Sequence, residues 1–298
     1  MTNATQEAHT MTLEQGLEAF LDALSGKNRS SATLRAYRTD VLQFIIFLHE
    51  NNVAITLPSD VGKVDVLEYL SFLAKRALTG VARARKLSAI REYFRFLEGV
   101  GVIHKSPTTG IDAPKKEKNT RQYLRSDEFT KMLSLAGANP RDYCILQVFL
   151  QTGIRVSELA SLTIEDIDFI KPSITVRGKG RVEREIALEK RGVQGLKNYL
   201  AVRPVSLSSI LFLNYKGEPI SERGIRKVVV KYRKNAGITK KASCHSLRHT
   251  FATYKAERGV SPFQLQQWLG HANLNTTQIY VHLGKQNAKK IMEQTSLA

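Results

Sequence analysis

The sequence predicts a mostly α-helical protein with one small β-hairpin, divided into two domains. Apolar residues recur at steps of three and four in several long segments, which is the pattern of helices that bury one face. One segment alternates apolar and polar residues on both sides of a Gly-Lys-Gly sequence, as β-hairpins do. A polar, basic stretch at residues 113–122 has the composition of a linker, and it separates a helical domain, residues 11–112, from a mixed α/β domain, residues 123–298.

The charge balance is the most informative feature of the composition. The 298 residues include 45 Lys and Arg against 27 Asp and Glu, which is a formal net charge of +18. Such an excess favours a polyanionic partner, most often nucleic acid. An anionic membrane is the alternative, but no apolar run reaches the roughly 18 residues that a spanning helix needs.

The N-terminal sequence and the cysteines indicate a compartment. The first ten residues are polar and contain no recognisable secretory signal. Two cysteines, Cys144 and Cys244, lie far apart and suggest neither a disulfide framework nor a zinc site. We therefore expect a cytoplasmic, nucleoid-associated protein without a membrane partner.

Four helices are expected in the helical domain, over residues 13–24, 31–51, 64–78 and 80–100. The apolar face expected for 31–51 consists of Leu34, Tyr37, Val41, Phe44, Ile45 and Leu48. The face expected for 80–100 consists of Leu87, Ile90, Phe94 and Leu97. The same segment carries five basic residues, Arg83, Arg85, Lys86, Arg91 and Arg95. We expect them to form a DNA-binding surface, with ordinary solvated charge as the alternative.

The mixed domain contains the hairpin and further helices. Ser126 and two following acidic residues indicate a helix start, and residues 143–151 form a strongly apolar helix. Residues 173–188 form the expected hairpin, with Lys179 at its turn. More helices are expected over residues 191–202, 221–235, 245–258 and 262–269.

Several kinds of chemistry have no support in the sequence. A phosphate-binding Gly-x-x-x-x-Gly-Lys-Ser/Thr loop is absent, so no ATP-driven step is expected. The acidic residues at 165–168 lack the further carboxylates of a two-metal site. Cys244, His245 and His249 are close in sequence, but they do not make a complete set of zinc ligands. We expect no metal and no cofactor.

A set of cations and one tyrosine remain. Arg155 follows an apolar helix and a glycine turn, and Lys179 sits at the hairpin tip. His245 and Arg248 are three residues apart, on one face of a helix. His271 follows a helix that ends at a glycine, and Tyr280 lies nine residues further on. Each of these residues alone has an ordinary explanation, as a surface charge or as a polar residue of a loop or turn.

Together these residues suit a reaction in which a tyrosine hydroxyl attacks the phosphorus of a phosphodiester. Two guanidiniums match the oxygens of a phosphate that gains negative charge in the transition state. Histidines hydrogen-bond or move protons near neutral pH, and a hairpin lysine can protonate the departing 5′ oxygen. A phenol, with a pKa of about 10, leaves more easily than an alkyl alcohol when the step reverses. Because the phosphotyrosyl bond conserves the energy of the broken bond, rejoining needs neither ATP nor metal.

Four segments, in this order, resemble signature motifs of the tyrosine recombinase (phage integrase) family. They are Thr-Gly-Ile-Arg155-Val-Ser-Glu-Leu, His245-Ser-Leu-Arg248-His-Thr, Leu-Gly-His271-Ala and Thr-Thr-Gln-Ile-Tyr280. The motifs span residues from about 123 to the end of the chain. The helical domain also resembles the family's SAM-like core-binding domain in outline, so the resemblance implies that fold beside a mixed α/β tyrosine recombinase catalytic domain.

The resemblance also implies a role for each residue. Tyr280 corresponds to the nucleophile that forms a 3′-phosphotyrosyl bond, Arg155 and Arg248 to the residues that hold the scissile phosphate, and Lys179 to the general acid. His245 corresponds to a base, His271 to a phosphate hydrogen-bond donor and Glu158 to an acidic residue that supports the site.

The resemblance implies an Xer-like site-specific recombinase that acts on double-stranded DNA. It also implies a homotetramer on paired sites, with or without a paralogous recombinase. A type IB topoisomerase and a DNA-binding protein that has lost catalysis are the alternatives. The sequence leaves open the DNA site and the choice among integration, excision, inversion and resolution.

Overall fold

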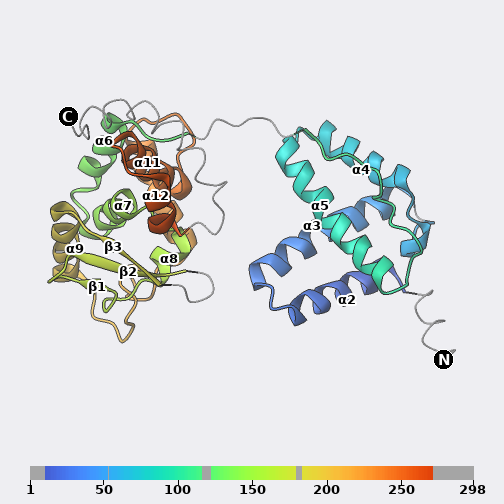
Figure 1. Ribbon diagram of the computed structural model, residues 1–298, viewed down its shortest axis with the longest axis horizontal. Helices are drawn as coiled ribbons and strands as arrows, with labels where there is room; N and C mark the ends of the chain where they lie inside the picture. Colours follow the sequence, from blue (N-terminus) through green and yellow to red (C-terminus); the bar gives the residue numbers. More distant parts are fainter. Residues whose placement is uncertain (1–10, 53, 116–121, 179–182, 271–298) are drawn as a thin grey trace, which may run out of the picture. The chain divides into compact units, whose positions relative to one another are not determined.

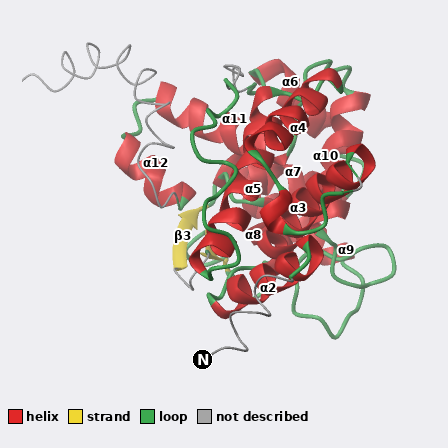
Figure 2. Cartoon of the chain, turned by 90° about the vertical axis from the view of Figure 1, so that its right-hand side faces the viewer, coloured by secondary structure: helices red, strands yellow, loops and turns green. Residues whose placement is uncertain are grey.

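The chain divides into two compact units, Met1–Asn119 and Thr120–Ala298, and each is described by itself (Figure 1). The computed structural model describes residues 11–52, 54–115, 122–178 and 183–270. The described part is predominantly helical, as Figure 2 shows, and it contains one small sheet. The predicted fold class is therefore confirmed. Within the described residues, no helix is both long and apolar enough to cross a membrane.

The first unit is built from four helices, and each of them was expected. They are α2 (Leu13–Gly26), α3 (Ser31–Asn51), α4 (Lys63–Lys75) and α5 (Gly80–Gly99), with a short 3₁₀ turn, η1 (Pro58–Asp60), before α4. A capping box begins α2, because Thr12 and Gln15 each satisfy the other's backbone amide. The expected helix at 64–78 ends earlier, at Lys75, since Ala77 takes a left-handed conformation with φ +56°.

Apolar faces hold the four helices together. Helices α2, α3 and α5 pack pairwise, and α4 packs against α3 and α5. The four predicted core residues of α5 are fully buried, and those of α3 are buried from Val41 to Leu48. Rings of Phe44 and Phe94 meet edge to face at 6.2 Å, which joins α3 to α5. The Tyr93 hydroxyl donates to the Leu13 carbonyl at 2.8 Å, which joins α5 to the start of α2.

One of the five basic residues of α5 is not on an exposed face. The Lys86 side chain is 8% exposed, and its Nζ donates to Asp40 Oδ1 at 3.0 Å and to Gln43 of α3. The expectation that Lys86 lies on the basic surface is therefore wrong, because this position faces α3. A buried ammonium needs such a partner, and the buried Asp40 carboxylate supplies it.

The other four basic residues differ in their exposure. Arg85 and Arg95 are 57% and 67% exposed and pair with Asp40 and Glu92. Arg91 is half-buried and donates to the Ile111 carbonyl, and Arg83 is also half-buried. The exposed basic surface of α5 is thus narrower than the sequence suggested.

The second unit surrounds one apolar helix. Its helices are α6 (Ser126–Ala136), α7 (Pro140–Thr152), α8 (Val156–Ser161), α9 (Lys190–Val202), α10 (Glu222–Asn235), α11 (Cys244–Glu257) and α12 (Pro262–Leu269). Helix α7 lies at the centre, in contact with α6, α9, α10 and α11 (Figure 1). Its buried residues include Cys144, Ile145, Leu146, Val148 and Phe149. The predicted helices are confirmed, whereas α8 was not predicted because six residues are too few to display a period.

The predicted hairpin is part of a three-stranded antiparallel sheet. Strands β1 (Ile167–Asp168), β2 (Ser173–Arg177) and β3 (Glu183–Ala187) lie in the order β1-β2-β3. Ile174 is paired with Ile186 on one side and with Ile167 on the other. The strand β1 was not predicted, since two residues become a strand only through their pairing. Lys179 lies outside the described residues.

Candidate active site

The site begins at the turn after α7. Gly153 caps this helix with φ +61°, and its amide donates to the Phe149 carbonyl at 2.9 Å. A Cβ at this glycine would lie 2.4 Å from the Phe251 ring and 3.0 Å from Leu269. Only glycine therefore fits both the left-handed backbone and the available space. The turn places Arg155 at the N-cap of α8.

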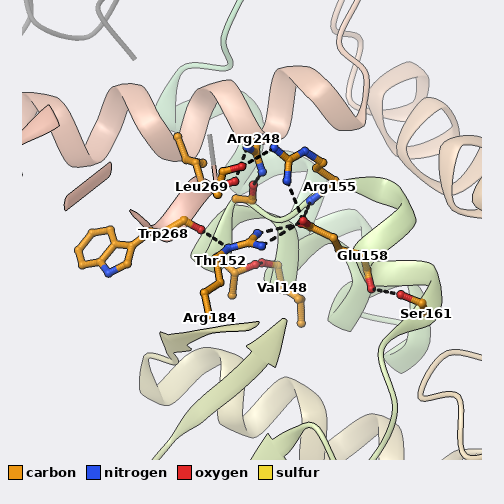
Figure 3. A network of polar contacts seen from close by, with 11 residues as sticks. Val148, Thr152, Arg155, Glu158, Ser161, Arg184, Arg248, Trp268 and Leu269 are labelled. Atoms are coloured by element: carbon orange, nitrogen blue, oxygen red, sulfur yellow. Dashed lines mark hydrogen bonds and ion pairs between the residues drawn. The ribbon is translucent and has the colours of Figure 1, made fainter. Parts of the chain in front are cut away.

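Arg155 faces two partners in the site (Figure 3). Its Nη1 donates to Glu158 Oε1 at 2.8 Å, and its backbone amide donates to Oε2 of the same carboxylate at 2.7 Å. Its Nη2 donates to the Gly270 carbonyl, 115 residues away in sequence, at 2.7 Å. The side chain is 40% exposed, so the guanidinium is both held in place and open to solvent.

Glu158 is the buried anion of the site. Its side chain is 5% exposed and accepts from Arg155 and from both Nη atoms of Arg184, at 3.0 and 2.8 Å. Burial by itself raises the pKa of this carboxyl. The hydrogen bonds and charge of Arg184, together with the backbone and side-chain hydrogen bonds of Arg155, outweigh burial and lower the pKa below its usual value. The carboxylate is therefore ionised at neutral pH.

Arg248 connects the ends of two helices. It lies in the second turn of α11, which begins after the capping Ser243, and its side chain is buried. Its Nη1 donates to the Gly153 carbonyl at 2.8 Å and its Nη2 to the Leu269 carbonyl at 2.6 Å (Figure 3). These contacts bring Arg248 to the turn that precedes Arg155.

The two histidines of α11 lie in different surroundings. His245 is in the first turn, one turn before Arg248, and its side chain is exposed. His249 is buried, and its ring meets that of Tyr123 edge to face at 6.1 Å. Within the described residues, no three histidine, cysteine or acidic side chains are grouped as metal ligands.

Arg184, on β3, is a site residue that was not predicted from the sequence. It donates to Glu158 and, through Nε, to the Trp268 carbonyl at 2.7 Å (Figure 3). Its side chain is 12% exposed. The two-residue period of a β-strand could have predicted this position, because Arg184 lies two residues before the buried Ile186 and shares its face of the sheet.

The structure thus brings together three of the residues expected from the sequence, which are Arg155, Glu158 and Arg248. His245 lies on the same helix as Arg248. His271 and Tyr280, like the hairpin lysine, lie outside the described residues. In the described cluster, three guanidiniums stand against a single carboxylate, so the site has an excess of positive charge and suits an anionic group such as a phosphate.

Comparison with known protein families accounts for both units. Residues 122–287 match the phage integrase family, and residues 17–99 match the N-terminal SAM-like domain of phage integrases. The chain therefore belongs to the phage integrase family of tyrosine recombinases. The predicted family and enzyme class are confirmed.

Individual tyrosine recombinases are similar to this protein over most of its length. The tyrosine recombinase XerC of Thermodesulfovibrio yellowstonii is 35% identical over 284 residues, which covers 90% of this chain and 91% of the relative. The crystal structure of XerA recombinase is 30% identical, with a TM-score of 0.54, and the match covers 96% of this chain and 99% of that one. A lambda integrase tetramer bound to a Holliday junction shares the fold, with a TM-score of 0.76 at 18% identity, over 94% of this chain and 80% of that one.

Proposed function

We propose that this chain is a site-specific recombinase that cleaves and rejoins DNA through a 3′-phosphotyrosyl bond to Tyr280. The observation that carries the proposal is the convergence of Arg155 and Arg248 at the C-terminal end of α12. In sequence, this end leads directly into the motif that contains His271 and Tyr280. Two guanidiniums held at the residues that immediately precede this motif in the sequence suit a phosphate that a tyrosine attacks.

The proposed step is a transesterification. The Tyr280 oxygen bonds to phosphorus, the bond from phosphorus to the 5′ oxygen breaks, and the 5′ oxygen takes up a proton. Attack by the 5′ hydroxyl of another strand reverses the step and releases the tyrosine. Arg155 and Arg248 would bind the non-bridging oxygens, where negative charge develops in the transition state.

Other residues of the proposed mechanism move protons or orient the phosphate. We assign Lys179 to protonating the departing 5′ oxygen, His245 to accepting the phenol proton and His271 to a hydrogen bond with the phosphate. Glu158 supports the site by holding Arg155 in place. Its lowered pKa supports this role, because an ionised carboxylate keeps its hold on the guanidinium across neutral pH.

The proposed substrate is a pair of double-stranded DNA sites, bound by a homotetramer or by a tetramer shared with a paralogous recombinase. The net charge of +18 suits a long polyanion. The solved lambda integrase tetramer on a Holliday junction is similar in fold. The proposed domains are a core-binding domain over residues 11–112, a linker over 113–122 and a catalytic domain over 123–298. Action on cellular DNA would place the protein in the cytoplasm, at the nucleoid.

The decisive experiment is covalent trapping. The protein is incubated with nicked genomic DNA of its source organism, so that the short cleaved strand diffuses away and the protein remains attached. After denaturation, the attached ends are sequenced, and a nicked duplex of the enriched sequence is synthesised. Wild-type protein is expected to form a complex with this duplex that survives denaturation.

Tyr280→Phe is expected to form no such complex, because it lacks the attacking oxygen, while its affinity for the duplex stays near that of the wild type. Tyr215→Phe is the matched control, since Tyr215 is a solvent-exposed tyrosine of the same unit. The nucleophile assignment would be wrong if the Tyr280 variant were trapped as efficiently as this control. Absence of trapping by the wild type would reject the function itself.

A further inference from the structure

We propose that Arg184 is a positioning residue for strand cleavage. It would hold the C-terminal end of α12 and share the charge of Glu158 with Arg155, so that the carboxylate offsets less of the positive potential that Arg155 presents to the phosphate. The inference rests on the proposed function, because it concerns the rate of that same cleavage step. Arg184 itself is not proposed to touch the DNA.

The end of α12 is held by three arginines. The three successive carbonyls of residues 268–270 each accept a hydrogen bond from a different guanidinium, and the arginines come from β3, α11 and the start of α8 (Figure 3). The pairs are Arg184 with Trp268 at 2.7 Å, Arg248 with Leu269 at 2.6 Å and Arg155 with Gly270 at 2.7 Å.

These contacts have a clear electrostatic basis. The last carbonyls of a helix have no partner within the helix, and they carry the partial negative charge of the helix dipole. Two of the three arginines, Arg155 and Arg248, are the proposed phosphate ligands. Arg184 is the third, and its contact with Trp268 anchors the last turn of α12 to the sheet. The chain beyond this turn leads to Tyr280, so the turn sets where that segment starts.

The second contact of Arg184 balances charge. Both Nη atoms donate to Glu158, one to each oxygen, in the two-pronged geometry that arginine forms with carboxylates. Glu158 also binds Arg155, so one negative charge is divided between two guanidiniums. Without Arg184, the buried carboxylate would be neutralised by Arg155 alone. The positive charge that Arg155 presents to a phosphate would then be weaker.

Gly270 adds a steric observation. Its φ is +62°, and a Cβ at this position would lie 3.1 Å from Nη1 of Arg184. The Arg184 side chain therefore occupies the space beside the last residue before His271. The close approach shows that the guanidinium and the end of α12 fit against each other at the carbonyl cluster.

The proposal is tested by measuring single-turnover cleavage of the synthetic nicked duplex that is used for trapping. Arg184→Gln removes the charge and the paired geometry, and we expect the cleavage rate at saturating DNA to fall about 10- to 100-fold, as for small misplacements of reacting groups. Affinity for the duplex should stay within about threefold of the wild type, because the lost interaction acts mainly in the transition state. Arg184→Lys keeps the charge but loses the fork, so it should recover part of the rate.

Arg141→Gln is a matched control for stability. Arg141 also donates to a buried carboxylate, Asp142, and to a backbone carbonyl, that of Leu213, but it lies in the first turn of α7, at the opposite end from Gly153. This variant should lose stability in thermal unfolding without losing cleavage rate. Equal rate losses in the Arg141 and Arg184 variants at matched stability would overturn the positioning role, and so would a wild-type rate in Arg184→Gln.

A double-mutant cycle tests the charge-sharing half of the proposal. If Arg184 acts through Glu158, Arg184→Gln should slow cleavage less in a Glu158→Gln background than in the wild type. If the rate loss of the double variant were the product of the losses of the two single variants, charge sharing would be rejected. Tyr280→Phe is measured beside these variants. If the wild type and Arg184→Gln are trapped at the same rate, only the Arg184 proposal is rejected. If the wild type is not trapped at all, the proposed function is rejected.

Discussion

Glu158 shows how one residue organises the site. Its carboxylate receives the backbone amide and side chain of Arg155, which is close in sequence, and the fork of Arg184, which is 26 residues away. A buried carboxylate without such partners would be strongly disfavoured. The two arginines therefore stabilise the buried carboxylate, and the carboxylate in turn holds Arg155, a proposed phosphate ligand, in place.

The lowered pKa of Glu158 leads to a prediction about stability and pH. Because the pKa is lower in the folded than in the unfolded state, the stabilisation is complete above the unfolded value and is lost as pH falls through the folded value. Glu158→Gln should reduce the unfolding free energy by roughly 1–3 kcal/mol at neutral pH. The difference from wild type should shrink as pH falls below about 4.

The measurement is urea unfolding at a series of pH values, followed by tryptophan fluorescence. The chain has one tryptophan, Trp268, and it lies in α12 beside the site. Its signal therefore reports on the second unit. A difference between the two proteins that stayed constant down to acidic pH would show that the charge of Glu158 does not stabilise the fold.

At the scale of elements, helix ends determine the site. Helix α7 must stop at Thr152 for Arg155 to cap α8, and α12 must stop at Leu269 for its carbonyls to face the arginines. Both helices end at a glycine with positive φ, Gly153 and Gly270. The sequence already indicated both stops, because a glycine after an apolar helix is a common C-terminal signal.

Gly153→Ala should destabilise the second unit and slow cleavage. The left-handed backbone costs about 1–2 kcal/mol for a residue with a Cβ, and the contact with Phe251 at 2.4 Å adds to it. Gly237→Ala is the control, since Gly237 has φ +73° but nothing within 4 Å of its Cβ position. Urea unfolding should show a clearly larger loss for Gly153→Ala. Equal losses would mean that the crowding at Gly153 is relieved without cost.

Long periodic elements were predictable and short ones were not. Helices α3 and α5 repeat their apolar residues over several turns, so the pattern alone located them. Helix α8 and strand β1 have too few residues for any period, and they depend on the capping by Glu158 and on pairing with β2.

At the scale of the whole molecule, the excess of basic residues should govern DNA affinity. Each phosphate contact releases counterions, so affinity falls linearly with salt concentration on a logarithmic scale. Arg85 and Arg95 are the exposed basic residues of the surface predicted on α5, whereas Lys86 is buried against Asp40. The two kinds of residue should therefore affect binding differently.

We expect Arg85→Gln and Arg95→Gln each to reduce the salt slope of DNA binding by about 1. Lys86→Met should leave the slope unchanged and lower the stability of the first unit instead, because Asp40 would lose its buried partner. Binding isotherms between about 50 and 200 mM salt, together with thermal unfolding, distinguish the two effects. A slope unchanged in both arginine variants would assign their charge to the solvated surface.

The helices, the hairpin and the family motifs were predictable from the sequence, and the motif around Arg155 implied that Glu158 supports the site. These features depend on residues a few positions apart, whose spacing directly sets which side chains share a face. Only the folded chain shows that Lys86 is buried, that Arg184 belongs to the site and that three arginines meet at the end of α12. Those outcomes join residues 21 to 115 positions apart, and only the packing of whole elements brings such residues into contact.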